Sequence, residues 1–134
     1  MRAYIAIKYH SDNRNRSAID HISRALEQNG YDTVCIARDL EEWGQVHFAP
    51  GELMQRSFEA LGGSDIVVVD LTEKGVGIGI EAGYALANRI PIITIAKSGS
   101  DISTTLQGIS QAVAWYDSFD ELVELFAQTI AHGE

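Results

Sequence analysis

The 134 residues of this chain, 46% of them hydrophobic and 22% charged, suffice for a buried core and match the composition of ordinary globular proteins. The formal net charge of −9 argues against nucleic acid or an anionic membrane as the main partner, since both attract a basic surface. No segment resembles a signal peptide or a long transmembrane helix, so we expect a cytoplasmic protein. The single cysteine, Cys35, stands in an apolar run and is predicted to be a buried side chain rather than a reactive thiol.

The beginning of the chain predicts a strand, a helix and a second strand. A short apolar run at residues 4–7 is followed by an abruptly polar stretch. Asp12 or Asn13 is expected to cap a helix that continues to about Asn29, where an Asn-Gly pair stops it. A second apolar run at residues 33–37 completes a βαβ unit.

Residues 40–50 are the least regular part of the chain and contain Trp43. Pro50 suits the first turn of a helix that extends to about Leu61. Large apolar side chains share one face of this helix with Ser57, which places a small polar residue on an otherwise inward-facing surface.

The stretch from residue 65 to residue 97 has the clearest pattern. An unbroken apolar run ends at Asp70 and leads into a loop that holds three glycines, Gly75, Gly77 and Gly79. Glu81 follows in a helical pattern of small and apolar residues, and Pro91 opens a second apolar run. This order predicts a buried strand, a Gly-rich turn, a helix and another buried strand, with the Glu81 carboxylate where the turn becomes the helix.

The last part of the chain predicts two further helices and one further strand. After a strand at residues 92–96, Ser100 or Asp101 is expected to cap a short helix. Residues 112–116 are predicted to form an edge strand, and Ser118 is predicted to cap the final helix.

The alternation of strands and helices predicts a single α/β domain over residues 1–134, doubly wound and flavodoxin- or Rossmann-like, with about five parallel strands. The carboxyl ends of parallel strands share one edge of the sheet, where such folds bind ligands. Basic residues gather after the predicted strands, whereas the loops that precede strands at 30–32 and 62–65 carry none. An anionic ligand is therefore expected at that edge, although exposed loops are often charged for no such reason. The basic residues concerned are Lys8, Arg14, Arg16, Arg38, Lys74 and Lys97.

The segment 75–85, with the sequence GVGIGIEAGYA, resembles the signature of the nucleoside 2-deoxyribosyltransferase superfamily, which includes deoxynucleoside-monophosphate N-glycosidases and related nucleotide hydrolases. The resemblance implies that Glu81 is the nucleophile attacking C1′ of the sugar, and that Tyr4 hydrogen-bonds to Glu81 and positions it. Cleavage or transfer of an N-glycosidic bond passes through an oxocarbenium-like state, which a carboxylate can capture as a glycosyl-enzyme. Without the surrounding motif, Glu81 would be an ordinary glutamate at the start of a helix.

The same resemblance implies a set of substrate contacts. Ser103 resembles a serine that contacts phosphate from a neighbouring subunit in the monophosphate glycosidases, while a hydroxyl in the first turn of a helix is the alternative. The predicted substrate-binding residues are Lys8, His10, Arg14, Ser57, Gly75, Gly77, Gly79 and Ser103. We expect a small-molecule nucleotide or nucleoside as partner, a homodimer or higher homo-oligomer, and neither a metal ion nor a cofactor.

The chain departs from the family pattern at one chemically important position. Family members usually carry an aspartate that holds or protonates the substrate about eight residues before the position of Asp65, and this chain has Ser57 there. A hydroxyl cannot act as a general acid near neutral pH, so a proton for the departing base must come from elsewhere, unless the leaving group needs none. His10, Asp39 and Glu52 are candidates that the sequence does not rank. The departure favours a divergent member of the superfamily.

Other interpretations stand beside this one. A non-catalytic nucleotide-binding or sensing domain of the same fold is favoured by Ser57. A phosphoacceptor domain would use Asp70, but Lys8 and His10 stand where such a domain needs an acidic pair. The Gly77-x-Gly79 spacing lacks the third glycine of a dinucleotide fingerprint. Trp43 either stacks on a base or forms a lid over the pocket, or, as is more usual for an aromatic residue in a long loop, it anchors that loop.

Overall fold

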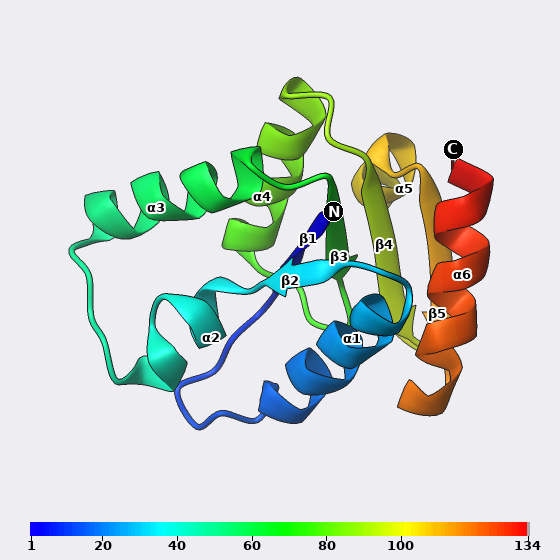
Figure 1. Cartoon of the computed structure of the whole chain (residues 1–134), viewed down its shortest axis with the longest axis horizontal. Helices are drawn as coiled ribbons and strands as arrows, with labels where there is room; N and C mark the ends of the chain where they lie inside the picture. The colour runs from blue at the N-terminus through cyan, green and yellow to red at the C-terminus, as the bar shows by residue number, and fades with distance from the viewer. Residues whose placement is uncertain (134) are drawn as a thin grey trace.

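Five parallel strands form one sheet in the order β2-β1-β3-β4-β5 in this computed structural model, which describes residues 1–133 and side chains as far as residue 130. The prediction of a doubly wound α/β fold with five parallel strands is confirmed (Figure 1). The strand order reverses between β1 and β3, so the switch point lies at their carboxyl ends. The strands are β1 (Arg2–Ile7), β2 (Asp32–Val34), β3 (Ile66–Asp70), β4 (Ile92–Lys97) and β5 (Ala112–Tyr116).

Helices cover both faces of the sheet (Figure 1). The helices α1 (Arg16–Gln28) and α6 (Leu122–Gly133) pack on one face and against each other. The helices α3 (Pro50–Gly62), α4 (Val76–Ala87) and α5 (Thr104–Ile109) pack on the other face. A short helix α2 (Ile36–Asp39) and the 3₁₀ turn η1 (Glu42–Gly44) lie between β2 and α3, and the 3₁₀ turn η2 (Phe119–Glu121) leads into α6.

The central strands are buried on both sides, which is why they read as continuous apolar runs. In β3, Val68 packs into the core under α1 and α6, whereas Val67 and Val69 pack into the core under α3, α4 and α5. The same alternation puts Tyr4 of β1 on the α3–α4 side, paired in register between Val34 and Val67. Tyr4 is fully buried there, so its hydroxyl needs a partner.

Two details of the first βαβ unit were predicted incorrectly. The second strand was predicted at residues 33–37, but β2 ends at Val34. The chain turns there into α2, and the Asp39 carboxylate accepts a hydrogen bond from the Cys35 backbone N–H at 2.9 Å. The cap of α1 is Asn15 and not Asp12 or Asn13, since the Asp12 carboxylate binds the Arg14 guanidinium instead. Cys35 is buried, as predicted.

The helix that carries Glu81 begins earlier than the glycine pattern suggested. Gly75 is the N-cap of α4, and Gly77 and Gly79 lie inside the helix rather than in a loop. Glu81 therefore stands in the second turn of α4. The cap of α5 is Ser103, not Ser100 or Asp101, because the Ser103 hydroxyl accepts the Leu106 N–H at 3.3 Å.

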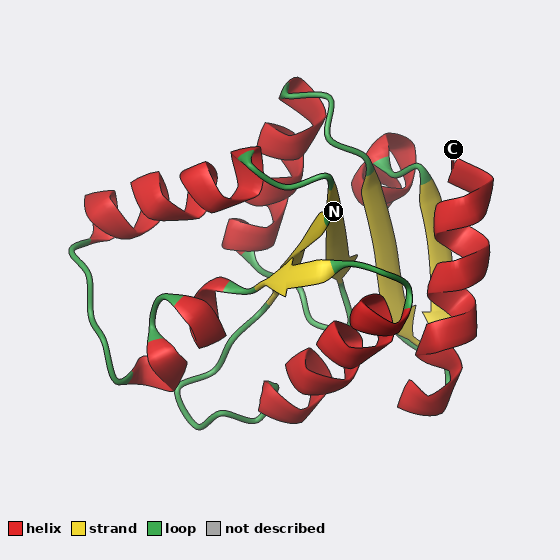
Figure 2. Cartoon of the chain, viewed as in Figure 1, coloured by secondary structure: helices red, strands yellow, loops and turns green. Residues whose placement is uncertain are grey.

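The remaining predicted boundaries agree with the structure to within about two residues. Helix α3 starts at Pro50 and buries Ser57, and the Ser118 hydroxyl accepts the Asp120 N–H at the start of η2. Figure 2 shows the irregular connection between η1 and α3 as a long loop at one side of the molecule. In the part of the chain that the structure describes, no helix has the length and apolar character needed to cross a membrane.

Candidate active site

The Tyr4 hydroxyl donates a hydrogen bond to Oε2 of Glu81. Tyr4 comes from the buried strand β1, and Glu81 comes from the second turn of α4, the helix that follows β3 in the chain. Strands β1 and β3 are neighbours, and the switch point lies between them. Burial raises the pKa of the Glu81 carboxyl to about 7, and the hydrogen bond from Tyr4 opposes this rise. Burial, followed by the neighbouring Glu81 carboxylate, raises the pKa of the Tyr4 phenol far above its usual range, so Tyr4 remains a donor.

Glu81 borders two neighbouring hollows at the carboxyl end of β1. The first has a volume of about 170 Å³ and runs between β1, the segment after β2, and α3. The second has a volume of about 290 Å³ and runs between the loop after β1 and the first turn of α4. Ile7, Tyr9, Gly77 and Glu81 line both. The carboxylate thus stands at the junction of two spaces that one elongated ligand could fill, at the place where doubly wound folds bind their ligands.

The first hollow, called the inner hollow below, is walled mainly by apolar side chains. Its polar groups are few: Tyr4, Ser57, Glu81, Tyr9 and Glu41. The Ser57 hydroxyl donates to the Leu53 carbonyl at 2.8 Å, and a hydrogen bond with Ser57 also lowers the pKa of Tyr4 slightly against the larger effect of burial. The apolar lining residues include Ile5, Ala6, Ile7, Ile36, Leu53 and Met54.

The second hollow, called the outer hollow below, contains Lys8 and the start of α4. Gly75 and Gly77 both line it. A Cβ atom added at Gly77 would meet nothing within 4 Å, so packing within the described chain does not require glycine there, and the space beside the helix stays open. The first N–H groups of a helix and a lysine together favour an anion.

The structure brings only half of the predicted binding residues to Glu81. Lys8, Ser57, Gly75 and Gly77 line the two hollows. The other four do not line either hollow. His10 pairs with Glu73 at 2.5 Å, and Arg14 pairs with Asp12 at 2.9 Å. Gly79 is exposed, and Ser103 caps α5.

None of the three candidate proton donors lines the hollows. His10 pairs with Glu73, and Asp39 is bound by the Arg38 guanidinium and the Cys35 N–H. Glu52 is exposed on α3 and pairs with Arg56 at 3.0 Å. Besides Glu81, the inner hollow is lined by the carboxyl group of Glu41. The sequence prediction missed Glu41 because residues 40–50 carry no recognisable periodicity.

Most of the six basic residues expected at the carboxyl edge are held by other groups. Arg38 donates to Ser23 Oγ at 2.8 Å and to the Thr33 carbonyl at 3.1 Å, and Lys74 donates to the Leu71 and Asp101 carbonyls. Arg16 lies over the Trp43 ring at 4.5 Å. Lys8 is the member of the six that lines a hollow beside Glu81.

Trp43 anchors its loop, since it packs against the core beneath α1 and contacts the Tyr9 ring at a centroid distance of 6.1 Å. It does not line either hollow beside Glu81.

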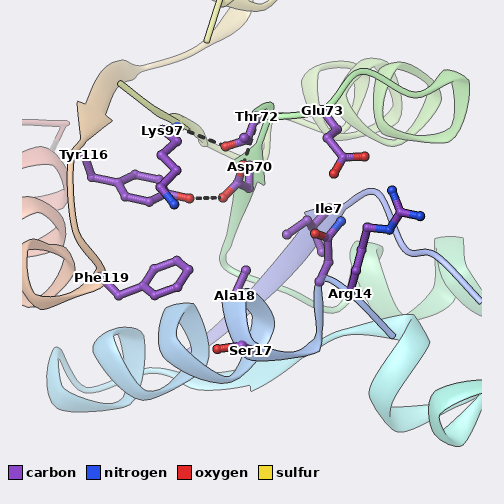
Figure 3. A pocket seen from close by; sticks show the side chains of 11 residues that line it. Ile7, Arg14, Ser17, Ala18, Asp70, Thr72, Glu73, Lys97, Tyr116 and Phe119 are labelled. Carbon is purple, nitrogen blue, oxygen red and sulfur yellow. Dashed lines mark hydrogen bonds between the residues drawn. The ribbon is translucent and has the colours of Figure 1, made fainter. Parts of the chain in front are cut away.

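A third cavity of about 220 Å³ lies on the other face of the sheet, between β3, β4 and the start of α1 (Figure 3). Asp70 lies at its base and is buried. The Asp70 carboxylate accepts hydrogen bonds from the Tyr116 hydroxyl at 2.7 Å and from the Thr72 N–H at 2.8 Å (Figure 3). Burial and Asp70 both raise the pKa of the Tyr116 phenol. Because Asp70 is already engaged in this way, the geometry disfavours a phosphoacceptor role for it.

No group of three or more His, Cys, Asp or Glu side chains within the described residues has an arrangement that could hold a metal ion.

No family model matches the chain. A protein of Thermofilum pendens, provisionally named 2′-deoxynucleoside 5′-phosphate N-hydrolase 1, is 26% identical over 132 residues, which cover 92% of this chain and 91% of that protein. A CMP N-glycosidase of Clostridium botulinum superposes with a TM-score of 0.69 at 18% identity, covering 96% of this chain and 98% of that one. A 2-deoxyribosyltransferase of Bacillus psychrosaccharolyticus gives a TM-score of 0.70 at 13% identity, covering 96% of both chains. These likenesses confirm the predicted resemblance to the nucleoside 2-deoxyribosyltransferase superfamily, at low identity.

Proposed function

We propose that this protein cleaves or transfers the N-glycosidic bond of a nucleotide or nucleoside, with Glu81 as the nucleophile. The observation that carries the proposal is the Tyr4–Glu81 hydrogen bond at the junction of the two hollows. A buried strand holds the tyrosine, so the carboxylate it binds is kept in one orientation. The names of the Thermofilum protein and of the two structural neighbours support the same type of reaction.

In the proposed reaction an oxygen of the ionised Glu81 carboxylate attacks C1′ of the sugar. The C1′–N bond breaks, its electron pair leaves with the base, and a glycosyl-enzyme remains. Water then attacks C1′ and releases Glu81 in hydrolysis, whereas a second base does so in transfer. Tyr4 keeps its hydrogen bond to Glu81 and is a positioning residue in this scheme.

The two hollows suggest how the substrate lies. The inner hollow has apolar walls suited to the flat face of a base, and the sugar would lie at Glu81. The outer hollow, with Lys8 and the start of α4, would receive a 5′-phosphate. A nucleoside monophosphate fits this arrangement of charge better than a neutral nucleoside does.

Release of free base from a panel of ribo- and deoxyribonucleosides and their 5′-monophosphates tests the proposal. We expect release from at least one member and its loss in Glu81→Gln. If the wild-type protein releases base from none of them, or if Glu81→Gln is as active as the wild type, the proposal is wrong.

A second candidate function is nucleotide binding without turnover. Ser57 stands where the family carries an acid. The other residues of the predicted binding set that line the hollows are Lys8, Gly75 and Gly77, and none of them is a carboxylic acid. This candidate predicts that a nucleotide raises the melting temperature without any base release. Base release that depends on Glu81 excludes it.

We also propose that the chain forms a homodimer through α4. The outward face of this helix is apolar: Val76, Ile80 and Leu86 are 83%, 48% and 51% exposed, and Gly79 and Gly83 have open space beside them. A surface helix that is apolar on its outer face normally packs against another protein surface. Such a partner would pack against the helix that carries Glu81. Sedimentation of the protein at several concentrations measures this association.

A further inference from the structure

Glu41 places a second carboxyl group in the inner hollow. It comes from the segment between α2 and η1, whereas Glu81 comes from α4, so two separate parts of the chain each contribute one acid to the same space of about 170 Å³. Among the described residues, no hydrogen-bond donor or ion-pair partner binds the Glu41 carboxyl group. A partly buried acid that no other side chain binds through a hydrogen bond or ion pair can interact with whatever fills the hollow.

The backbone fixes Glu41 despite its irregular surroundings. Its N–H donates to the Ile36 carbonyl at 3.0 Å, and its carbonyl accepts from the Gly44 N–H at 2.9 Å. The next three residues all have positive φ, with values of 46° at Glu42, 58° at Trp43 and 92° at Gly44. Left-handed backbone is costly at the two residues that are not glycine, and such strain persists only where surrounding contacts enforce it. The Trp43 ring, held between Arg16 and the core, supplies that anchor.

Burial in the inner hollow raises the pKa of both acids. Burial raises the pKa of Glu41, and His47 opposes the rise. Burial also raises the pKa of Cys35 to about 11 and keeps Tyr4 neutral, so neither supplies a charge, and Tyr9 is the other titratable group of the lining. No lysine or arginine is among the described residues that line this hollow. Burial among mainly apolar side chains therefore disfavours the ionised form of each acid, and His47 opposes this effect only at Glu41.

We propose that Glu41 is the proton donor to the departing base, an inference that rests on the proposed function. While Glu81 attacks C1′ and the C1′–N bond breaks, the Glu41 carboxylic acid gives its proton to the base and becomes a carboxylate. In the second half-reaction that carboxylate takes a proton from the attacking water, and C1′ is released from Glu81. Glu41 thereby fills the role that Ser57 cannot fill, and the cycle returns both acids to their starting states.

The test is the pH dependence of kcat/KM for base release in Glu41→Gln, compared with the matched variant of the exposed neighbour, Glu42→Gln. For the wild type and Glu42→Gln we expect a bell-shaped profile. For Glu41→Gln we expect kcat/KM to fall by about 10²- to 10⁴-fold and the alkaline decline to disappear, because no acid is left to titrate. Melting temperatures verify that each variant is folded, and Glu41→Asp, which keeps an acid, should retain the alkaline decline.

Two results are decisive against the inference. If Glu41→Gln matches Glu42→Gln in rate and in profile, Glu41 is not the proton donor although the proposed function stands. If the wild type releases no base from any nucleotide or nucleoside, the proposed function itself fails and the role of Glu41 fails with it.

Discussion

Tyr4 and Glu81 are 77 positions apart in the chain, yet the Tyr4 hydroxyl donates directly to the Glu81 carboxylate. The contact exists because β1 and β3 are neighbours in the sheet and α4 returns over the face of the sheet that carries Tyr4. The donor is buried and stays protonated, so the contact persists over the whole physiological pH range.

Tyr4→Phe removes this hydrogen bond while keeping the ring that fills the core. We expect kcat/KM for base release to fall about 10- to 100-fold, the range expected for a hydrogen bond to a charged group. Because the hydrogen bond lowers the pKa of Glu81, the acidic side of the pH profile should also move to higher pH. An unchanged acidic side would show that Tyr4 does not influence the charge of Glu81.

The activity should depend on the ionisation of Glu81. A nucleophilic carboxylate must be ionised, and burial raises the pKa of Glu81 to about 7 in the folded protein without ligand. In Glu41→Gln, where the proposed second acid no longer titrates, we therefore expect kcat/KM to rise with pH between about 6 and 8. If kcat/KM instead rises around the ordinary glutamate pKa of 4.5, the Glu81 carboxylate is solvated in the active protein.

The same group should make stability depend on pH. The pKa of Glu81 is about 7 in the folded state against 4.5 for the unperturbed side chain, so between these values the folded state keeps a proton that the unfolded state releases. The free energy of unfolding should accordingly fall as pH rises from 5 to 8, by at most about 3 kcal/mol for this group. Denaturant unfolding of the wild type and of Glu81→Gln at both pH values isolates the effect, since the other titrating groups are common to both. An equal change in the two proteins would contradict the prediction.

Lys8→Ala should separate phosphate binding from the chemistry. Lys8 lines the outer hollow, so we expect KM for a nucleoside 5′-monophosphate to rise about tenfold, with little change for the corresponding nucleoside. Arg14→Ala is the matched control, because Arg14 pairs with Asp12 and borders the cavity on the other face of the sheet. Equal effects of the two variants would count against a phosphate at Lys8.

Ile80→Asp should weaken self-association through α4. Ile80 is 48% exposed in the middle of the apolar outer face, and a charge there would be desolvated in the interface. Sedimentation should show the variant as a monomer at concentrations where the wild type is a dimer. The control is Ala127→Asp on the exposed side of α6, which packs on the opposite face of the sheet. A monomeric wild type would rule out the proposed dimer.

Local patterns in the sequence were sufficient for the strands and for most of the helices. Apolar runs such as 66–69 and helical spacing report burial directly, and Pro50 and Ser118 mark helix starts through their own backbone chemistry. Local patterns were insufficient where several residues compete for one role. Asp12 and Asn13 were each candidates to cap α1, but Asp12 binds Arg14 and the cap is Asn15. Of the three glycines at 75, 77 and 79, Gly75 caps α4, and the other two lie inside the helix.

The sequence by itself determined that this chain forms a doubly wound α/β sheet and that Glu81 lies near the start of the helix after the third strand, because both follow from short-range periodicity and from a contiguous motif. Only the tertiary structure decided which side chains surround that carboxylate. Lys8, Ser57 and Glu41 come from three different segments of the chain to line the hollows beside it, while His10, Arg14 and Ser103 find partners elsewhere. Side-chain contacts of this kind depend on how distant segments pack, and the irregular segment that presents Glu41 has no periodicity from which its position could be predicted.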